Sequence, residues 1–472
     1  MSASRHVRLL ALGLLFAAPL ALPSTGHPAR ADDAPSEPAM GGGAAPGTDE
    51  PDGPVPFVEG VGKAIERGVA WLKTKQLKDG SFGPITAEEL YDPKAKGTPY
   101  LRPAASTGLA LYALLKCDVP IDDPVVKKGF NFLRTKYPKP GDTYEVSIVL
   151  LAVTATADPF KRHNDSVAAG DRVKLSADWL RWANELITTL IRRHKQLGWR
   201  YNEEIAGSTS SVPPGGNQDL SSTQLACLAL YSAERCGLHV PSQIYADMIL
   251  FARQQQEDEG PERDRAIVPK GAGAKKPAPN DPYAKPGVPG TPKDQARGFA
   301  YIKNPSMAKE RERVATGAMT GCGLATILMS RYVLMQRDDA VWKKQDQKAI
   351  QRAIYDGYAW LDANWSSTTN PVGNWYHVYY KYCVERACDL TGNALIGKAN
   401  WYVEMGQDLI SSQKDGANEK EGFWDTASTH GPHDVLDTCF ALLFLKRATK
   451  GAIPYPTLTG GSDDPPIDNR DK

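Results

Sequence analysis

Residues 76–83 read QLKDGSFG, and variants of this glycine–aromatic turn recur along the chain. Further copies lie at 196–201, at 254–256 together with 298–301, at 365–375 and at 413–424. Glycine allows the backbone of such a turn to reach positive φ, and the aromatic ring can pack across neighbouring helix ends. A turn that recurs in this way predicts one stacked or closed array of repeats rather than several domains.

Between the turns, amphipathic helical stretches alternate with stretches that are apolar nearly all round. Amphipathic helices are expected at about 60–76, 124–136, 174–195, 241–256, 344–364 and 399–413. Their apolar partners are expected at about 106–117, 143–155, 219–236, 314–336, 374–389 and 434–448. An amphipathic helix keeps its polar face in water, whereas an apolar helix must be covered by its neighbours. The pattern therefore predicts an all-α fold, an α/α toroid of about six helical hairpins around a central cavity.

The N-terminus has the pattern of an export signal. A basic start precedes an apolar run at 9–22, and small residues follow in the A-x-A pattern at 29–31. The apolar run is shorter than the span of about 20 residues that a bilayer requires, although the segment could also stay as an uncleaved anchor. We expect a signal peptide over 1–31, with export to the periplasm or the cell exterior.

Three further segments lack apolar periodicity and are rich in Pro, Gly and charged residues. They predict a disordered linker, a disordered insertion and a flexible tail at 32–56, 257–298 and 451–472. The helical pattern resumes after the insertion, so the toroid is expected to occupy 57–450 as one domain.

Composition excludes some classes of function. The 472 residues are 41% hydrophobic and 24% charged, which is typical of a globular protein. The chain has 56 basic and 55 acidic residues, so its charges nearly cancel and net charge gives no reason to expect a nucleic-acid partner. No later stretch is long and apolar enough to predict a transmembrane segment after signal cleavage. The seven cysteines are odd in number, scattered and mostly in apolar helices, so we expect mostly free, buried thiols.

The repeated Q-x-x-D-G-S-F-G turn after alternate helices resembles the repeat of the squalene cyclase and protein prenyltransferase β-subunit superfamily. The resemblance covers most of 57–450. It implies a toroid whose cavity binds or transforms a hydrophobic, isoprenoid-like ligand, in the manner of a prenyltransferase or terpene cyclase. The sequence leaves open whether the chain is an enzyme, because toroids of this kind host several chemistries and some only bind.

Residues 434–438 read DVLDT, at the start of the last apolar helix. Cyclases of the squalene–hopene type start a cavity helix with D-x-D-D-T, in which the middle Asp is the proton donor. Asp434 and Asp437 match the outer acids, but Leu436 stands at the donor position and cannot protonate an alkene. Cyclisation by that mechanism is disfavoured. Asp434, Asp437 and Tyr376 are the candidate catalytic residues.

A second set of residues is similar to the zinc ligands of protein prenyltransferase β-subunits. Asp437 and Cys439 form a D-x-C string, and His377 lies in a string that resembles D-x-Y-H-x-x-Y, with Asn374 in place of its Asp. The resemblance implies a catalytic zinc at His377, Asp437 and Cys439. The two strings occur in the reverse of the family order. From the residues alone, the same three could be a helix cap, a core thiol and a hydrogen-bonded imidazole.

Two other classes of function stay open. A carbohydrate-active toroid needs paired carboxylates, or a Tyr or His base, near the cavity, together with Trp and Tyr side chains on which sugars stack. The acids and rings available there are Glu145, Asp219, Asp434, Asp437, Trp375, Tyr376 and Trp424. A non-catalytic secreted scaffold is the other class. The isoprenoid-like interpretation predicts a hydrophobic small molecule as the partner, and the scaffold interpretation predicts a protein.

Overall fold

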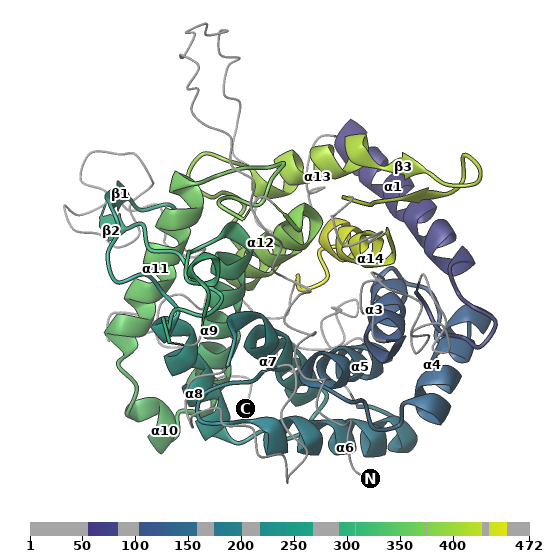
Figure 1. Ribbon diagram of the computed structural model, residues 1–472, viewed down its shortest axis with the longest axis horizontal. Helices are drawn as coiled ribbons and strands as arrows, with labels where there is room; N and C mark the ends of the chain where they lie inside the picture. The colour runs from purple at the N-terminus through teal and green to yellow at the C-terminus, as the bar shows by residue number, and fades with distance from the viewer. Residues whose placement is uncertain are drawn as a thin grey trace, which may run out of the picture.

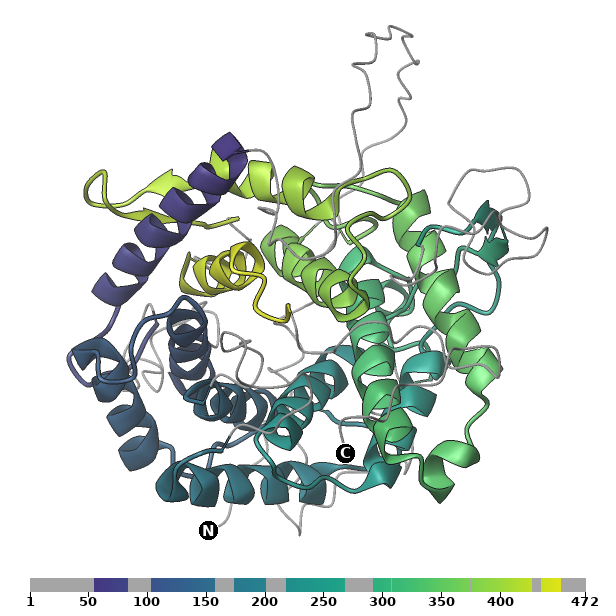
Figure 2. The ribbon, with the colours of Figure 1, turned by 180° about the vertical axis from the view of Figure 1, so that it is seen from behind.

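Two concentric rings of helices make up the described chain (Figures 1 and 2). The computed structural model describes residues 55–83, 103–157, 174–200, 218–267, 292–306, 308–373, 375–426 and 434–450. The outer helices are α1 (Val55–Thr74), α4 (Pro124–Lys136), α6 (Ala177–Arg193), α8 (Ser242–Gln254), α11 (Gln347–Ala363) and α13 (Trp401–Ser412). The inner helices are α3 (Pro103–Lys116), α5 (Thr143–Ala155), α7 (Leu220–Arg235), α9 (Gly317–Arg337), α12 (His377–Thr391) and α14 (Asp434–Leu445).

The inner ring is closed. Each inner helix contacts the next one in the chain, and α14 returns to contact α3 (Figure 1). The short elements are α10 (Ala340–Lys343), the 3-10 helix η1 (Glu310–Glu312), and the strands β1 (Glu262–Asp264), β2 (Lys293–Gln295), β3 (Lys414–Asp415) and β4 (Gly422–Phe423). The predicted all-α toroid of six hairpins, with amphipathic helices outside and apolar ones inside, is confirmed.

Among the residues that the structure describes, α9 is the one helix long and apolar enough to cross a bilayer. Nearly all of it is buried by neighbouring helices, as is typical of a core helix.

The glutamine of the repeated turn connects neighbouring outer helices. Its side-chain amide donates to a carbonyl of the next outer helix in three repeats: Gln76 to Val125 at 2.8 Å, Gln256 to Ala353 at 2.9 Å, and Gln413 to Ala64 at 2.9 Å. The last of these bonds runs from the end of α13 back to α1, so it closes the outer ring. The glutamine of the turn thus joins neighbouring outer helices in the same way at three places around the toroid.

The aromatic residue of the turn is tied to the inner helix that follows. A threonine hydroxyl near the start of that helix accepts the aromatic residue's N–H in four repeats: Phe82 with Thr107, Trp199 with Thr223, Phe299 with Thr320, and Trp424 with Thr438, at 3.0 to 3.1 Å. These threonines and aromatic residues are all buried. Because buried N–H groups need partners, each threonine fixes where its turn meets the inner ring.

Arg67 joins the first helix to the last hairpin. It lies on α1 and donates from Nη1 to Gln413 Oε1 at 3.0 Å and from Nε to the Glu419 carbonyl at 3.1 Å. It also pairs with Asp415 and donates to the Glu421 carbonyl, which places the β3–β4 hairpin against α1. Segments about 350 residues apart are therefore held together by one guanidinium and one glutamine.

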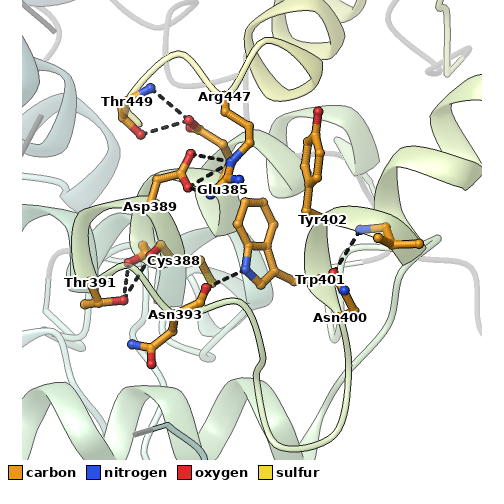
Figure 3. A network of polar contacts seen from close by, with 12 residues as sticks. Glu385, Cys388, Asp389, Thr391, Asn393, Asn400, Trp401, Tyr402, Arg447 and Thr449 are labelled. Carbon is orange, nitrogen blue, oxygen red and sulfur yellow. Dashed lines mark hydrogen bonds and ion pairs between the residues drawn. The ribbon is translucent and has the colours of Figure 1, made fainter. Parts of the chain in front are cut away.

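The rim formed by the C-terminal ends of the inner helices contains a buried polar network (Figure 3). Arg447, just after α14, donates from Nε to both carboxylate oxygens of Asp389 on α12, at 3.0 and 3.2 Å. Glu385 accepts from the Thr449 N–H and hydroxyl, both at 2.9 Å. These bonds fix the end of the last inner helix to its neighbour.

Both described ends of the predicted insertion are ordered and packed. β1 and β2 pair antiparallel, and Arg265 binds Asp294 at 2.9 Å with both side chains buried. The Gln295 N–H and the Arg297 guanidinium both bond Asp356 on α11. The prediction of disorder over 257–298 is therefore wrong at the two ends, because local composition does not reveal these contacts with α11.

The other predicted flanking segments lie outside the described residues. These are the signal peptide at 1–31, nearly all of the linker at 32–56, the tail at 451–472 and the middle of the insertion at 268–291. Helix α1 begins at Val55, two residues before the predicted start of the toroid.

Candidate functional site

The inner helices all begin at the same rim, and polar side chains cap several of them. Asp142 accepts the Glu145 N–H at 2.7 Å, Asp219 accepts the Ser222 N–H at 2.7 Å, and Thr316 accepts the Met319 N–H at 3.2 Å. Glu145 also accepts the Gly141 N–H at 2.7 Å. Two of the candidate acids, Glu145 and Asp219, are therefore engaged in ordering helix starts.

A cleft opens at this rim between η1 and the first turns of α9 and α12. The empty space among its lining residues, open solvent included, is about 480 Å³. Its lining combines aromatic rings, polar groups and a few apolar side chains: Tyr301, Arg311, Glu312, Val314, Thr316, Ala318, Met319, Asn370, Trp375, Tyr376 and Tyr379. An aromatic cleft with a small number of polar groups is the usual composition of a small-molecule site.

Asn370 lines the cleft and links the start of α9 to the segment that precedes α12. Its Oδ1 accepts the Ala318 N–H at 2.9 Å, and its Nδ2 donates to the Trp375 carbonyl at 3.0 Å. The Asn370 N–H donates to His377 Nδ1 at 3.0 Å. One buried side chain thus fixes the helix start of α9 relative to the two aromatic residues that precede α12.

The backbone around Asn370 is strained. Val372 and Tyr376 have φ values of +64° and +56°, in the left-handed region that side chains other than glycine rarely adopt. Such conformations persist where surrounding contacts hold them, and they concentrate at binding and catalytic sites. Tyr376 itself lines the cleft, as does Trp375, which lies between the two positive-φ residues in the chain.

Asp437 lies near Tyr376 at the start of α14. Its Oδ2 accepts the Thr426 N–H at 2.8 Å and the Thr426 hydroxyl at 2.6 Å. Burial is the main cause that raises the pKa of Asp437 to about 6; the charges of Asp425 and Asp434 add to the rise, and the two bonds to Thr426 oppose it. Burial also raises the pKa of Tyr376 to about 12, with a contribution from the Asp437 charge. The structure therefore places two of the three candidate catalytic residues within electrostatic reach of each other.

The third candidate, Asp434, lies at the first turn of the same helix. Its Oδ1 accepts the Val435 N–H at 2.8 Å, and its Oδ2 lies 3.8 Å from Lys75 Nζ.

The structure does not bring the three predicted zinc ligands together. His377 binds the Asn370 N–H, and burial and Lys381 lower its pKa, partly offset by Asp408 of the outer helix α13. Cys439 is fully buried among core side chains. Among the described residues no group of three or more His, Cys, Asp or Glu side chains is arranged to hold a metal ion.

Two predicted platforms, Trp375 and Tyr376, line the cleft, whereas the third does not. Trp424 is 1% exposed, and its indole donates to the Leu409 carbonyl at 2.8 Å, so it belongs to the core. Sequence reasoning missed the cleft residues outside the inner helices: Tyr301, Arg311, Glu312, Val314 and Asn370. They lie in connecting segments without periodicity, and the sequence carries no signal for their convergence.

Below the cleft, side chains from several inner helices meet at the axis of the ring. The Tyr144 hydroxyl donates to Ser221 Oγ at 2.6 Å, and Ser221 lies 3.4 Å from the Tyr379 hydroxyl. Tyr379 is in turn 3.4 Å from Cys322 Sγ and packs against the ring of Phe440, 5.1 Å between centroids. Polar and aromatic side chains of five inner helices, α5, α7, α9, α12 and α14, thus contact one another inside the ring.

No protein-family model matches the chain. No curated protein matches it either. Among solved structures, the chain is similar to the GH76 α-1,6-mannanase from Salegentibacter sp. HEL1_6, at 11% identity and a TM-score of 0.43, over 83% of this chain and 98% of that one. An inactive variant of the mannanase in complex with α-1,6-mannotriose matches at 10% identity and a TM-score of 0.41, over the same shares of the two chains.

These solved structures are mannanases rather than prenyltransferases or squalene cyclases. The prediction of the prenyltransferase and squalene cyclase superfamily, with its isoprenoid-like ligand, is therefore wrong. Of that prediction, the α/α toroid fold alone is confirmed.

Proposed function

We propose that this toroid binds a saccharide in the cleft between η1, α9 and α12. The observation that carries the proposal is the lining, in which Tyr301, Trp375 and Tyr376 accompany the charged and amide groups of Arg311 and Asn370. Aromatic faces pack against the C–H faces of sugar rings, while guanidinium, carboxylate and amide groups pair with hydroxyls. Export through the predicted signal peptide at 1–31 would bring the cleft to extracellular polysaccharide, and it forms part of the proposal.

Replacing Trp375 with alanine is expected to weaken saccharide binding about ten- to hundredfold. The indole forms part of the cleft wall, and loss of one buried aromatic surface costs roughly 1.5–3 kcal/mol. Calorimetric titration of the full chain with a panel of neutral oligosaccharides, α-1,6-mannotriose included, would measure the change.

Trp365 is the matched control for this experiment. Its indole donates to Glu404 of α13 at 2.8 Å, and it does not line the cleft. Trp365→Ala should leave the dissociation constant unchanged within a factor of about two. If no oligosaccharide binds the wild type, or if both variants weaken binding equally, the proposed cleft is not a saccharide site.

Glycoside hydrolysis is the second candidate function, and the observation that favours it is Asp437. A carboxyl group with a pKa of about 6 is protonated under mildly acidic conditions and can serve as a general acid. Hydrolysis also requires a second carboxylate, for which Glu312 in the cleft and Asp434 beside Asp437 are the candidates. Tyr376 would then position the sugar near the acid. Release of reducing ends by the wild type, and its loss in Asp437→Asn, would support this function.

The protonation of Asp437 predicts a pH dependence of stability. Because the pKa rises from 3.8 to about 6 on folding, its contribution is fully present below pH 3.8 and is lost as the pH rises through about 6. Asp437→Asn keeps an acceptor for Thr426 and removes the charge. The variant should therefore gain roughly 3 kcal/mol relative to the wild type between pH 4 and pH 7.

Denaturant unfolding of both proteins at several pH values would test this. Only the difference in free energy of unfolding between the two proteins at each pH is informative, because other buried acids, such as Asp219 and Asp356, titrate in both. A difference that stays constant with pH would show that Asp437 is ionised throughout, and the hydrolysis candidate would lose its acid.

A further inference from the structure

Arg386 on α12 is a buried cation that lacks a carboxylate partner. Its side chain is fully buried, and its Nη2 donates to Cys383 Sγ at 3.1 Å. Within the described ranges no carboxylate pairs with it, and its Nε and Nη1 have no hydrogen-bond partner. The ring of Tyr382 lies 4.0 Å from the guanidinium carbon. A guanidinium keeps its proton in proteins, and an uncompensated buried charge is strongly unfavourable, so an anion is expected beside it.

The groups beside Arg386 that can carry a negative charge are two thiols and two phenols. They are Cys322, Cys383, Tyr379 and Tyr382. A thiol loses its proton more readily than a phenol does. The compensating charge is therefore expected on sulfur, and the two sulfur atoms lie 3.6 Å apart.

The surroundings distinguish the two thiols. Burial and the Asp219 charge act to raise the pKa of Cys322, but hydrogen bonds with Cys383 and Tyr379 and the Arg386 charge outweigh them, so the pKa is lowered. Burial and the neighbouring Cys322 raise the pKa of Cys383 well above its usual value. Cys322 Sγ also lies 3.4 Å from the Tyr379 hydroxyl and 3.6 Å from Cys383 Sγ, and both of these groups can donate to it. Cys322 is therefore suited to be the thiolate, and Cys383, which Arg386 contacts, the thiol that donates to it.

Close packing of α9 on α12 creates this pair. Gly321 directly precedes Cys322, and a Cβ at Gly321 would lie 2.8 Å from the backbone carbonyl of Cys383. Bond formation requires the sulfur atoms to approach from 3.6 Å to about 2.05 Å, which side-chain rotation can supply between helices so close. The Tyr379 hydroxyl lies 3.4 Å from Cys322 Sγ, and Tyr379 also lines the cleft, so the pair lies directly below the cleft floor.

We propose that Cys322 and Cys383 are a peroxide-reactive dithiol that closes to a disulfide. The Cys322 thiolate attacks one oxygen of the peroxide, and the O–O bond breaks. Cys322 becomes a sulfenic acid, and the leaving hydroxide takes a proton from solvent to form water. Cys383 sulfur then attacks Cys322 sulfur, the S–O bond breaks, and the hydroxyl leaves with the Cys383 proton as a second water. Two thiols lose two electrons, and the peroxide gains them.

Hydrogen peroxide added to the reduced full-length chain tests the proposal. After a short exposure, alkylation of the remaining thiols and peptide mapping should show a link between Cys322 and Cys383. Cys383→Ser should stop the reaction at a sulfenic acid on Cys322, which dimedone traps. Arg386→Leu should slow the oxidation of Cys322 at least tenfold, and Arg386→Lys should restore much of the rate because it returns a positive charge.

Cys388 provides the internal control. It lies on the same helix, is fully buried, and its pKa is raised well above the usual value by burial and by Asp389. It should stay reduced, and Cys388→Ser should leave the rate at Cys322 unchanged. The proposal is overturned if no Cys322–Cys383 link forms, or if Cys322 reacts no faster than Cys388. If Arg386→Leu does not fold, the trapped sulfenic acid in Cys383→Ser decides the question.

Discussion

Replacing Gly321 with alanine should lower the free energy of unfolding by roughly 3 kcal/mol. The new Cβ would lie 2.8 Å from the Cβ, carbonyl carbon and carbonyl oxygen of Cys383. Two of these are backbone atoms that cannot rotate away, so α12 would have to shift relative to α9 and disturb the closed inner ring. Denaturant unfolding monitored by far-ultraviolet circular dichroism would measure the loss.

Gly62 on α1 offers a control, because its replacement with alanine should raise the free energy of unfolding rather than lower it. A Cβ at Gly62 meets no heavy atom of the described structure within 4 Å. Gly62→Ala should therefore stabilise the protein by roughly 0.5–1 kcal/mol, because alanine restricts the unfolded chain and favours a helix. If the two variants change stability by similar amounts, the close approach of α9 and α12 is wrong.

The fold was predictable because its determinants are local and repeated. The glutamine and the aromatic residue of the turn recur in the sequence, and both make the same bonds in several repeats, as Gln76 does with Val125 and Phe82 with Thr107. Alternation of amphipathic and apolar helices then leaves two concentric rings as the packing solution. The family assignment failed because this packing logic selects an architecture rather than a chemistry.

The candidate site was only partly predictable, because its residues come from separate segments. Trp375 and Tyr376 stood out as aromatic residues at a helix start. Asn370 did not, since its role depends on a bond to Ala318, more than 50 residues away. Helix geometry also separates residues that a motif brings together in sequence. Positions two apart on a helix face different directions, so Asp437 bonds Thr426 at the rim while Cys439 is buried in the core.

Arg447→Met is expected to destabilise the protein by about 3–5 kcal/mol, the range for loss of one partner of a buried ion pair. The Asp389 side chain is 0% exposed, and Arg447 binds both of its oxygens (Figure 3). Methionine keeps much of the aliphatic packing beside Trp401 and Tyr402 but leaves the carboxylate buried without its cation. Because this pair holds the end of α14 on α12, the loss should appear as a lower midpoint of global unfolding.

The adjacent residue supplies the comparison that isolates burial as the cause. Lys446 pairs with Asp118, but the two side chains are 36% and 46% exposed, and exposed pairs contribute about 0–1 kcal/mol. Lys446→Met should therefore change stability little. Adding Asp389→Asn to Arg447→Met should recover part of the loss, since it removes the buried charge that the first substitution leaves unpaired. Equal costs for the Lys446 and Arg447 variants, or no recovery in the double variant, would show that Asp389 does not depend on Arg447.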